Sequence, residues 1–495
     1  MKLQSTLAAL GLGLVLGCAR PAPPAPALVA PKVEKPPEPS GGVDRTRLPE
    51  PGQLKTWTPP TPRRSALKNG IKVWHLERGS TPLVSLLAVI PKGSATDPKA
   101  KAGTAYLMAD LLDEGAGTLG ALQLSDELQR LATDYSSGID VDYVMLAMDL
   151  LAENYGRSVE LLADIMRRPR FEAAEFKRRK DYFVAAAISN ESQPQAARSL
   201  AMLDVLFGDG YGGSVSQGTR SSLERIGLND VKAQYRRLIV PDGLEFVVIG
   251  GIEQTAATEA LERAFGDWAG KSSALEADVG GKTAAAALHL VDFPGAPQTV
   301  FSVVRRAPGA QSDSYFPAMV FNRGFGEAFT SRINLNLRED KGYAYGASSS
   351  FSRYRKIGYF AISSSVKTDV TRPSIDEVLS EISALCGKRP ITPAERNEAV
   401  SGLLLGFPGR FETPGGMAQQ FAGIVIYQRP VDWFDTWPVA VEAVDVPAAN
   451  RVANENCDPN SYSIVLAGDR ATIEPTLASL NRPLVLHDRQ GKRIP

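Results

Sequence analysis

The stretch "FTSRINLNLREDKGYAYGASSSFS", residues 329–352, places a helical pattern directly before a strand pattern. Apolar residues recur every four positions from Phe329 to Leu337, which predicts an amphipathic helix. Gly342 follows closely enough to cap the C-terminal end of this helix, and a strand is expected from Tyr343. The chain must therefore reverse direction within the segment.

This reversal can bring two polar side chains together, namely Arg338 near the end of the helix and Tyr345 on the strand. The guanidinium group offers a planar fork of donors for carbonyl or carboxylate groups. The phenol can donate a hydrogen bond to an oxygen atom. The alternative is a surface arginine bound to the last helical carbonyls and a tyrosine packed in a sheet.

The sequence around this segment contains an internal repeat. A strand pattern followed by a helical pattern at 82–94 recurs about 215 residues later at 297–309. A strand and helix at 240–266 recur in the same way at 458–480. Two repeats at one offset predict two similar domains, joined by a linker rich in Gly, Ser and Ala. The predicted boundaries are 64–268 for the first domain, 269–287 for the linker and 288–490 for the second domain.

Each predicted domain mixes helices and strands. The helical stretch at 152–168 is long, and the neighbouring strand patterns at 342–355 and 356–368 indicate a hairpin. We therefore expect an α+β fold in which each domain is an antiparallel sheet covered by helices.

The composition is that of an ordinary globular protein. Of the 495 residues, 43% are hydrophobic and 22% are charged, and the 55 basic residues balance the 55 acidic ones. A nucleic-acid-binding protein normally has a basic excess, so the sequence argues against that class.

The N-terminus carries a targeting signal. Lys2 precedes an apolar run at 7–17, which is too short to span a bilayer and is typical of a signal peptide. The run ends at Cys18 in "VLGC", which resembles a bacterial lipobox; the alternative is an ordinary secretory signal with an incidental cysteine. The proline-rich segment at 19–63 predicts an extended tether. We therefore expect a signal peptide at 1–18, lipidation of Cys18 and a periplasmic lipoprotein of the outer membrane.

Cysteine and histidine are scarce in the predicted folded part. Cys386 and Cys457 are far apart in sequence, and we expect two unpaired core thiols, with a disulfide as the alternative. The three histidines have no H-x-x-x-H spacing and no C-x-x-C pair accompanies them, so the sequence predicts no metal site. The histidines are His75, His289 and His487.

The segment at 329–352 resembles the signature of the insulinase-type (M16) metallopeptidases, S-R-L/I-x-x-x-L-R-E-x-x-G-x-A-Y. In that family, the Arg and the Tyr grip the substrate beside the scissile bond, and here they are Arg338 and Tyr345. Segments at 211–252 and 406–418 also resemble parts of the family, whose known duplication matches the internal repeat. The resemblance implies a clam-like half-chamber of two homologous domains. The matching residues are Ser331, Arg332, Leu337, Arg338, Glu339, Gly342, Ala344 and Tyr345.

The zinc motif of that family is missing. Active members carry H-x-x-E-H on a first-domain helix and a further Glu about 77 residues later. The helix expected at 103–115 occupies this position. Tyr106 replaces the first His, Ala109 the Glu and Asp110 the second His. Counting 77 residues from Asp110 leads to Ala187. The resemblance therefore implies no cofactor in this chain, and we expect Tyr106 and Asp110 to form hydrogen bonds across the vacated pocket.

The resemblance also suggests a function. In heteromeric members, one subunit carries zinc while its partner contributes the Arg and the Tyr. We therefore expect a non-catalytic subunit, inactive alone, that supplies Arg338, Tyr345 and part of the chamber wall to a zinc-bearing homologue. The assembly would be a heterodimer or larger, and its substrate an extended peptide. Gly324 and Gly326 lie where the family often has a glycine-rich loop, which predicts either a substrate loop or a tight turn. The alternative function is a non-proteolytic peptide-binding or scaffold lipoprotein of the envelope.

Overall fold

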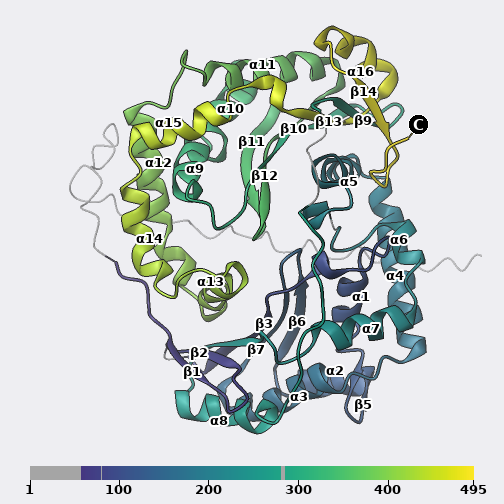
Figure 1. Ribbon diagram of the computed structural model, residues 1–495, viewed down its shortest axis with the longest axis vertical. Helices are drawn as coiled ribbons and strands as arrows, with labels where there is room; N and C mark the ends of the chain where they lie inside the picture. The colour runs from purple at the N-terminus through teal and green to yellow at the C-terminus, as the bar shows by residue number, and fades with distance from the viewer. Residues whose placement is uncertain (1–56, 80, 214, 280–284, 495) are drawn as a thin grey trace, which may run out of the picture. The chain divides into compact units, whose positions relative to one another are not determined.

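A computed structural model describes residues 57–79, 81–213, 215–279 and 285–494. The predicted signal peptide at 1–18, with Cys18, and most of the tether at 19–63 lie outside the described residues. The predicted linker at 269–287 is described except at 280–284. The described chain forms two large sheets and the helices that pack on them (Figure 1).

The first sheet is built from the first half of the chain. Its strands are β1 (Arg63–Ala66), β2 (Lys72–Glu77), β3 (Leu83–Ile90), β6 (Asp134–Ile139), β7 (Val144–Leu151) and β8 (Glu245–Gly250). They lie in the order β1-β2-β8-β3-β7-β6, so β1 and β6 are the edge strands. A separate two-stranded ladder consists of β4 (Gly115–Ala116) and β5 (Leu119–Gly120).

The second sheet repeats this arrangement. Its strands are β9 (Leu288–Asp292), β10 (Gln298–Pro308), β11 (Ala344–Arg353), β12 (Ile357–Lys367), β13 (Ser463–Gly468) and β14 (Leu484–His487). They lie in the order β11-β12-β10-β13-β9-β14. Read from the edge strands β6 and β11 inward, the first five strands follow one another in the same sequence order in both sheets, because β6-β7-β3-β8-β2 corresponds to β11-β12-β10-β13-β9. Only the outermost strand differs, because β1 precedes its half of the chain whereas β14 ends the other.

The predicted α+β fold of two sheet-containing domains is confirmed, and the predicted hairpin is the antiparallel pair β11 and β12. The sheets are, however, not purely antiparallel as predicted. β8 runs parallel to β2, and β9 runs parallel to both β13 and β14. In both halves, the chain passes through a long helical stretch before β8 pairs with β2 and β13 pairs with β9, and such a crossover permits parallel pairing.

Eight α-helices belong to the described part of each half. None of the helices in the described ranges is long and apolar enough to cross a membrane. Those of the first half are α1 (Thr104–Asp110), α2 (Ala121–Arg130), α3 (Tyr155–Arg167), α4 (Ala173–Glu191), α5 (Pro194–Phe207), α6 (Arg220–Glu224), α7 (Leu228–Leu238) and α8 (Gln254–Phe265). Those of the second half are α9 (Tyr315–Asn322), α10 (Arg332–Asn334), α11 (Thr371–Ala384), α12 (Pro393–Gly406), α13 (Pro414–Tyr427), α14 (Trp433–Glu442), α15 (Val446–Glu455) and α16 (Arg470–Leu477).

Each half contributes one helix to the sheet of the other half (Figure 1). Helix α13 packs on β3 and β8 of the first sheet, with Phe421 in the same buried cluster as Leu87 and Val89. Helix α5 packs on β10 and β13 of the second sheet, with Ala201 in one cluster with Val465. The two halves therefore share their cores.

This exchange explains why the central strands are apolar at nearly every position. In β3, Leu86 and Ala88 belong to the core made with helices of the first half, whereas Leu87 and Val89 belong to the core with α13. Successive side chains of a strand point to opposite faces. Both faces of the sheet are therefore buried, and a continuous apolar run results.

The helix predicted at the start of segment 329–352 is shorter and less regular than expected. Helix α10 spans only Arg332–Asn334, and the chain continues as π-helical turns over Leu335–Asp340. Gly342 then adopts a φ of +65°, a conformation that glycine reaches without strain and that lets the chain turn into β11.

The prediction of two free thiols is wrong. Cys386, just after α11, and Cys457, just after α15, form a disulfide. The two cysteines are 71 residues apart in sequence, and only the fold brings the ends of the two helices side by side.

The exchanged helix provides a test of the shared core. Replacing Phe421, which is buried on α13, with Ala leaves a cavity against the first sheet, and we expect a loss of about 3–5 kcal/mol of unfolding free energy. Urea unfolding measures this loss. Gln419→Ala, on the exposed side of the same helix, is the control and is expected to change stability by less than about 0.5 kcal/mol. A loss of similar size in both variants would contradict the shared core.

Candidate functional site

Arg338 lies in the π-helical turns before β11, at the surface. Its guanidinium carbon is 4.5 Å from the centroid of the Phe329 ring, and its Nε is 3.2 Å from a carboxylate oxygen of Glu339. The Phe329 side chain is itself 65% exposed. An aromatic ring beneath a guanidinium group holds it in place while its N–H donors stay accessible.

Tyr345 lies near the start of the edge strand β11 and is 95% exposed. No hydrogen bond or ring contact joins it to another side chain in the described part of the protein. The link to the arginine segment runs through Asn334, which donates to the carbonyl of Phe329 at 2.7 Å and accepts from the amide of Ala347 at 3.1 Å. Tyr345 on β11 and Arg338 in the π-helical turns therefore lie on two segments that the hydrogen bonds of Asn334 hold together.

The neighbouring Arg332 has a structural role. It is buried, and it donates to the carboxylate of Glu395 on α12 at 2.5 and 2.7 Å. It also donates to the carbonyls of Arg389 and Pro390 at 2.5 and 2.8 Å. The Ser-Arg part of the sequence pattern therefore anchors the segment, and Arg338 remains available for contact with a ligand.

The predicted glycine-rich loop is helical. Residues Arg323–Glu327, which include Gly324 and Gly326, form a π-helical turn that continues α9. A side chain at Gly326 would collide with Ser349 of β11, so glycine is required there for close packing. A cavity of about 430 Å³ is lined by residues of this turn and of α12, with Gly324 and Phe329 in its lining.

Helix α1 carries Tyr106, Ala109 and Asp110, which the resemblance aligns with the H-x-x-E-H motif of the family. The carboxylate of Asp97 caps its start by accepting from the amides of Gly103 and Ala105, both at 2.8 Å. Burial raises the pKa of Asp97 to about 7, and the hydrogen bonds from the backbone oppose this shift. Ala109 is fully buried, whereas Tyr106 and Asp110 lie on the side of α1 that faces α4.

A guanidinium group neutralises Asp110. Nε of Arg179 on α4 donates to Oδ2 of Asp110 at 2.6 Å, and Nη2 donates to the other carboxylate oxygen. Arg179 also lies 3.5 Å from a carboxylate oxygen of Glu114, and its guanidinium carbon is 5.2 Å from the Phe183 ring centroid. Bidentate pairing of this kind uses both oxygens of the carboxylate, so the Asp110 carboxylate is already bound by a residue of the same chain.

Tyr106 is also occupied. Its ring meets Phe183 of α4 edge to face at 5.2 Å, and its hydroxyl is hydrogen-bonded by the Gln217 side chain. Burial raises the pKa of Tyr106. Tyr106 and Asp110 thus both form hydrogen bonds in the vacated pocket, but with Gln217 and Arg179, which sequence reasoning did not identify. For Arg179 the available signal was the four-residue spacing of Arg179, Phe183 and Ala187, which puts all three on one face of α4.

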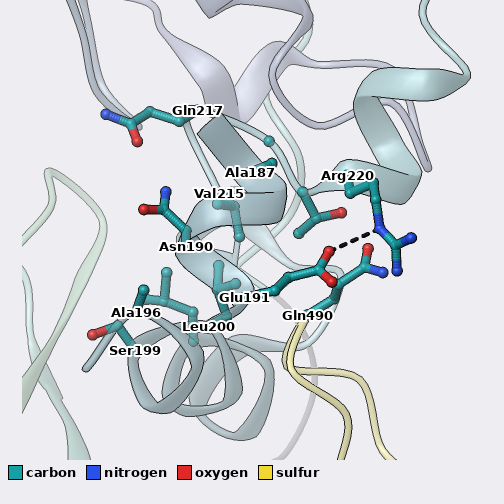
Figure 2. Close-up of a pocket in the computed structure, with 13 residues that line it drawn as sticks. Ala187, Asn190, Glu191, Ala196, Ser199, Leu200, Val215, Gln217, Arg220 and Gln490 are labelled. Atoms are coloured by element: carbon teal, nitrogen blue, oxygen red, sulfur yellow. Dashed lines mark hydrogen bonds and ion pairs between the residues drawn. The ribbon is translucent and has the colours of Figure 1, made fainter. Parts of the chain in front are cut away.

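Ala187 lies at the edge of a neighbouring pocket of about 240 Å³. Figure 2 shows it beside this pocket with Gln217, while the other walls come from α5 and Gln490. The nearest acidic residue on α4, Glu191, accepts from Arg220 at 2.9 Å. None of the described residues forms a group of three His, Cys, Asp or Glu side chains able to hold a metal ion. The residues at the zinc positions therefore do not fit zinc.

Two family models match the chain. Residues 73–215 match the insulinase family, peptidase family M16, and residues 225–403 match the peptidase M16 inactive domain. The chain belongs to the M16 family, as a member without the H-x-x-E-H motif.

Similar proteins agree with this assignment. An uncharacterized zinc protease of Mycobacterium leprae is 22% identical over 382 residues, which are 76% of this chain and 81% of that protein. The non-peptidase homolog YmxG of Helicobacter pylori is 26% identical over 166 residues, 33% of this chain and 38% of that protein.

Solved structures share the fold. The peptidase M16 inactive domain from Pseudomonas fluorescens matches with a TM-score of 0.75 at 20% identity, over 83% of this chain and 98% of that one. A protease from Helicobacter pylori also matches with a TM-score of 0.75, at 16% identity, over 82% of this chain and 99% of that one.

The pair of Arg179 and Asp110 generates a stability prediction. Their side chains are 22% and 18% exposed, so Arg179→Met leaves a largely desolvated carboxylate without its cation. We expect a loss of about 2 kcal/mol in a urea titration, between the values for surface and fully buried pairs. Arg178→Met removes a neighbouring arginine that is 53% exposed, and should cost less than about 1 kcal/mol. Equal losses would show that Arg179 does not neutralise Asp110.

Asp113 generates a pH prediction. Burial raises its pKa to about 7, and the nearby charges of Asp110 and Glu114 act in the same direction. The folded state then holds more protons than the unfolded state between about pH 4 and 7, so this group makes stability fall as pH rises through that window. We expect Asp113→Asn to be more stable than wild type at pH 8 by about 1–2 kcal/mol, and equal to it at pH 4. Thermal unfolding at both pH values measures this; a difference that does not depend on pH would contradict it.

Proposed function

We propose that this chain is the non-catalytic subunit of a bacterial M16 peptidase heteromer. It would supply Arg338, Tyr345 and part of the chamber wall to a zinc-bearing homologue. The proposal is supported by a contrast between two sets of residues in the chain. Asp110 is bound by Arg179 and Tyr106 packs on Phe183, whereas the Arg338 side chain is 38% exposed and Tyr345 is 95% exposed.

Exposed side chains suit a role at a shared active site. The fork of Arg338 would hold carbonyl groups of an extended peptide, and Phe329 would keep the fork in orientation. The Tyr345 hydroxyl would donate to the carbonyl oxygen on which negative charge develops, so it stabilises the transition state more than the bound substrate. The zinc ion of the partner would activate the attacking water.

The chain alone would not hydrolyse peptides. Hydrolysis by this family needs zinc ligands and a general base, and the equivalent positions carry Tyr106, Ala109, Asp110 and Ala187. The similarity to a non-peptidase homolog of Helicobacter pylori supports this proposal.

We further propose that the heteromer is held at the cell envelope. Cys18 would carry the lipid, and the proline-rich segment at 19–63 would keep the folded part away from the membrane, on the periplasmic side of the outer membrane. The disulfide between Cys386 and Cys457 supports an oxidising compartment.

Co-expression with a zinc-bearing homologue encoded beside this chain tests the function. We expect a stable complex that cleaves an unstructured peptide, and we expect Arg338→Ala and Tyr345→Phe each to lower kcat at least tenfold, because each removes a transition-state contact. Size-exclusion chromatography should show an intact complex for both variants. Arg410→Ala, which removes an exposed arginine on another segment, should keep full turnover.

The outcomes separate the proposal from its alternative. A complex that assembles and cleaves peptide equally well with wild-type chain and with both variants would eliminate the substrate-grip role. A chain that binds peptide but no zinc-bearing homologue would instead be a non-proteolytic peptide-binding or scaffold lipoprotein.

A further inference from the structure

Two arginines at the far end of β11 face one aromatic ring. The guanidinium carbon of Arg353, the last residue of β11, is 4.7 Å from the centroid of the Tyr315 ring. That of Arg429, which follows α13, is 4.5 Å from the same centroid and 4.3 Å from that of Trp433. Two like charges are thus held on one tyrosine, at the start of α9.

Within the described ranges, neither guanidinium group forms an ion pair or a hydrogen bond. The Nε atom of Arg429 and the Nε1 atom of Trp433 are both buried donors that have no acceptor among the residues the structure describes. Burial lowers the pKa of Arg353, and the charge of Arg429 lowers it further, whereas Tyr315 opposes the shift. Buried donors normally have partners, so an acceptor is missing from this cluster.

The nearby Arg355 shows what a paired arginine looks like in this fold. Its guanidinium group binds Glu276 and the carbonyl of Pro91, and its backbone amide donates to Asp142 at 2.6 Å. Two carboxylates near Arg355, those of Asp142 and Asp140, accept from backbone amides, since Asp140 accepts from the amide of Val141 at 2.7 Å.

We propose that Arg353 and Arg429 bind an oxyanion, a carboxylate or a phosphate group, beside the Tyr315 ring. Two planar forks supply paired donors that match the oxygens of such a group, and Trp433 Nε1 offers a further donor. Arginine, unlike lysine, combines this geometry with stacking on aromatic rings.

The position of the cluster suggests where the anion comes from. Tyr345 and Arg353 lie at opposite ends of β11, eight residues apart, which corresponds to about 26 Å along a strand. A peptide that followed β11 from Tyr345 could place its terminal carboxylate at Arg353. This source rests on the proposed function, whereas binding of free phosphate by the chain alone does not.

Calorimetric titration of the full chain at constant ionic strength tests the site. The probes are inorganic phosphate and one unstructured octapeptide, prepared with a free carboxylate and as its amide. We expect saturable binding of phosphate, of the free-acid peptide, or of both, and no binding of the amide at the same site. Binding should quench or shift tryptophan emission, because Trp433 stacks on Arg429, and this change should vanish in Trp433→Phe.

Arg353→Gln and Arg429→Gln should each weaken binding at least tenfold. Arg429→Lys, which keeps the charge but loses the fork, should weaken it less and guards against misfolding of the neutral variants. Arg410→Gln is the matched control, because Arg410 also stacks on aromatic rings, Phe407 and Trp437, and is exposed. Equal affinity of all variants, or no binding of either probe by wild type, would overturn the proposal. Retained phosphate binding together with an inactive heteromer would refute the proposed function alone.

Discussion

The double coverage of each sheet is the constraint on which the rest of the structure depends. Central strands such as β3 are apolar on both faces, and helices of their own half cover only one of them. The second face is covered by α13 or α5 from the other half. The two halves are consequently coupled in folding even though they repeat one topology. β6 and β11 are edge strands, and helix α1 and the segment that carries Arg338 pack beside these two edges.

At the β6 edge, helix α1 packs beside the sheet, and the residues that align with the zinc motif contact α4. A metal ion would need neutral or anionic ligands free to coordinate it. Here the one carboxylate at a ligand position, Asp110, already has a cation in Arg179, and Tyr106 has Gln217. At the β11 edge, Arg332 takes the structural contacts, whereas the Arg338 side chain is 38% exposed and Tyr345 is 95% exposed.

Much of this was predictable from sequence, because the repeat and the spacing of Arg338 and Tyr345 are local patterns. The α+β fold of two similar domains followed from them. The exchange of α5 and α13, the parallel pairs and the disulfide between Cys386 and Cys457 are contacts between distant segments, which periodicity does not encode. The partners Arg179 and Gln217 were missed for the same reason. The π-helical turns at Gly324 and Gly326 were missed because glycine normally predicts a loop, whereas here it permits close packing against Ser349.

We propose that this chain has lost the metal site of the M16 family and kept its substrate-facing residues. The most direct measurement is the zinc content of the purified full chain after equilibration with excess zinc and removal of free metal, by mass spectrometry of the dissolved protein. We expect far less than one zinc per chain and no peptide cleavage by the chain alone. One tightly held zinc per chain, together with peptide cleavage that a chelator abolishes, would contradict it.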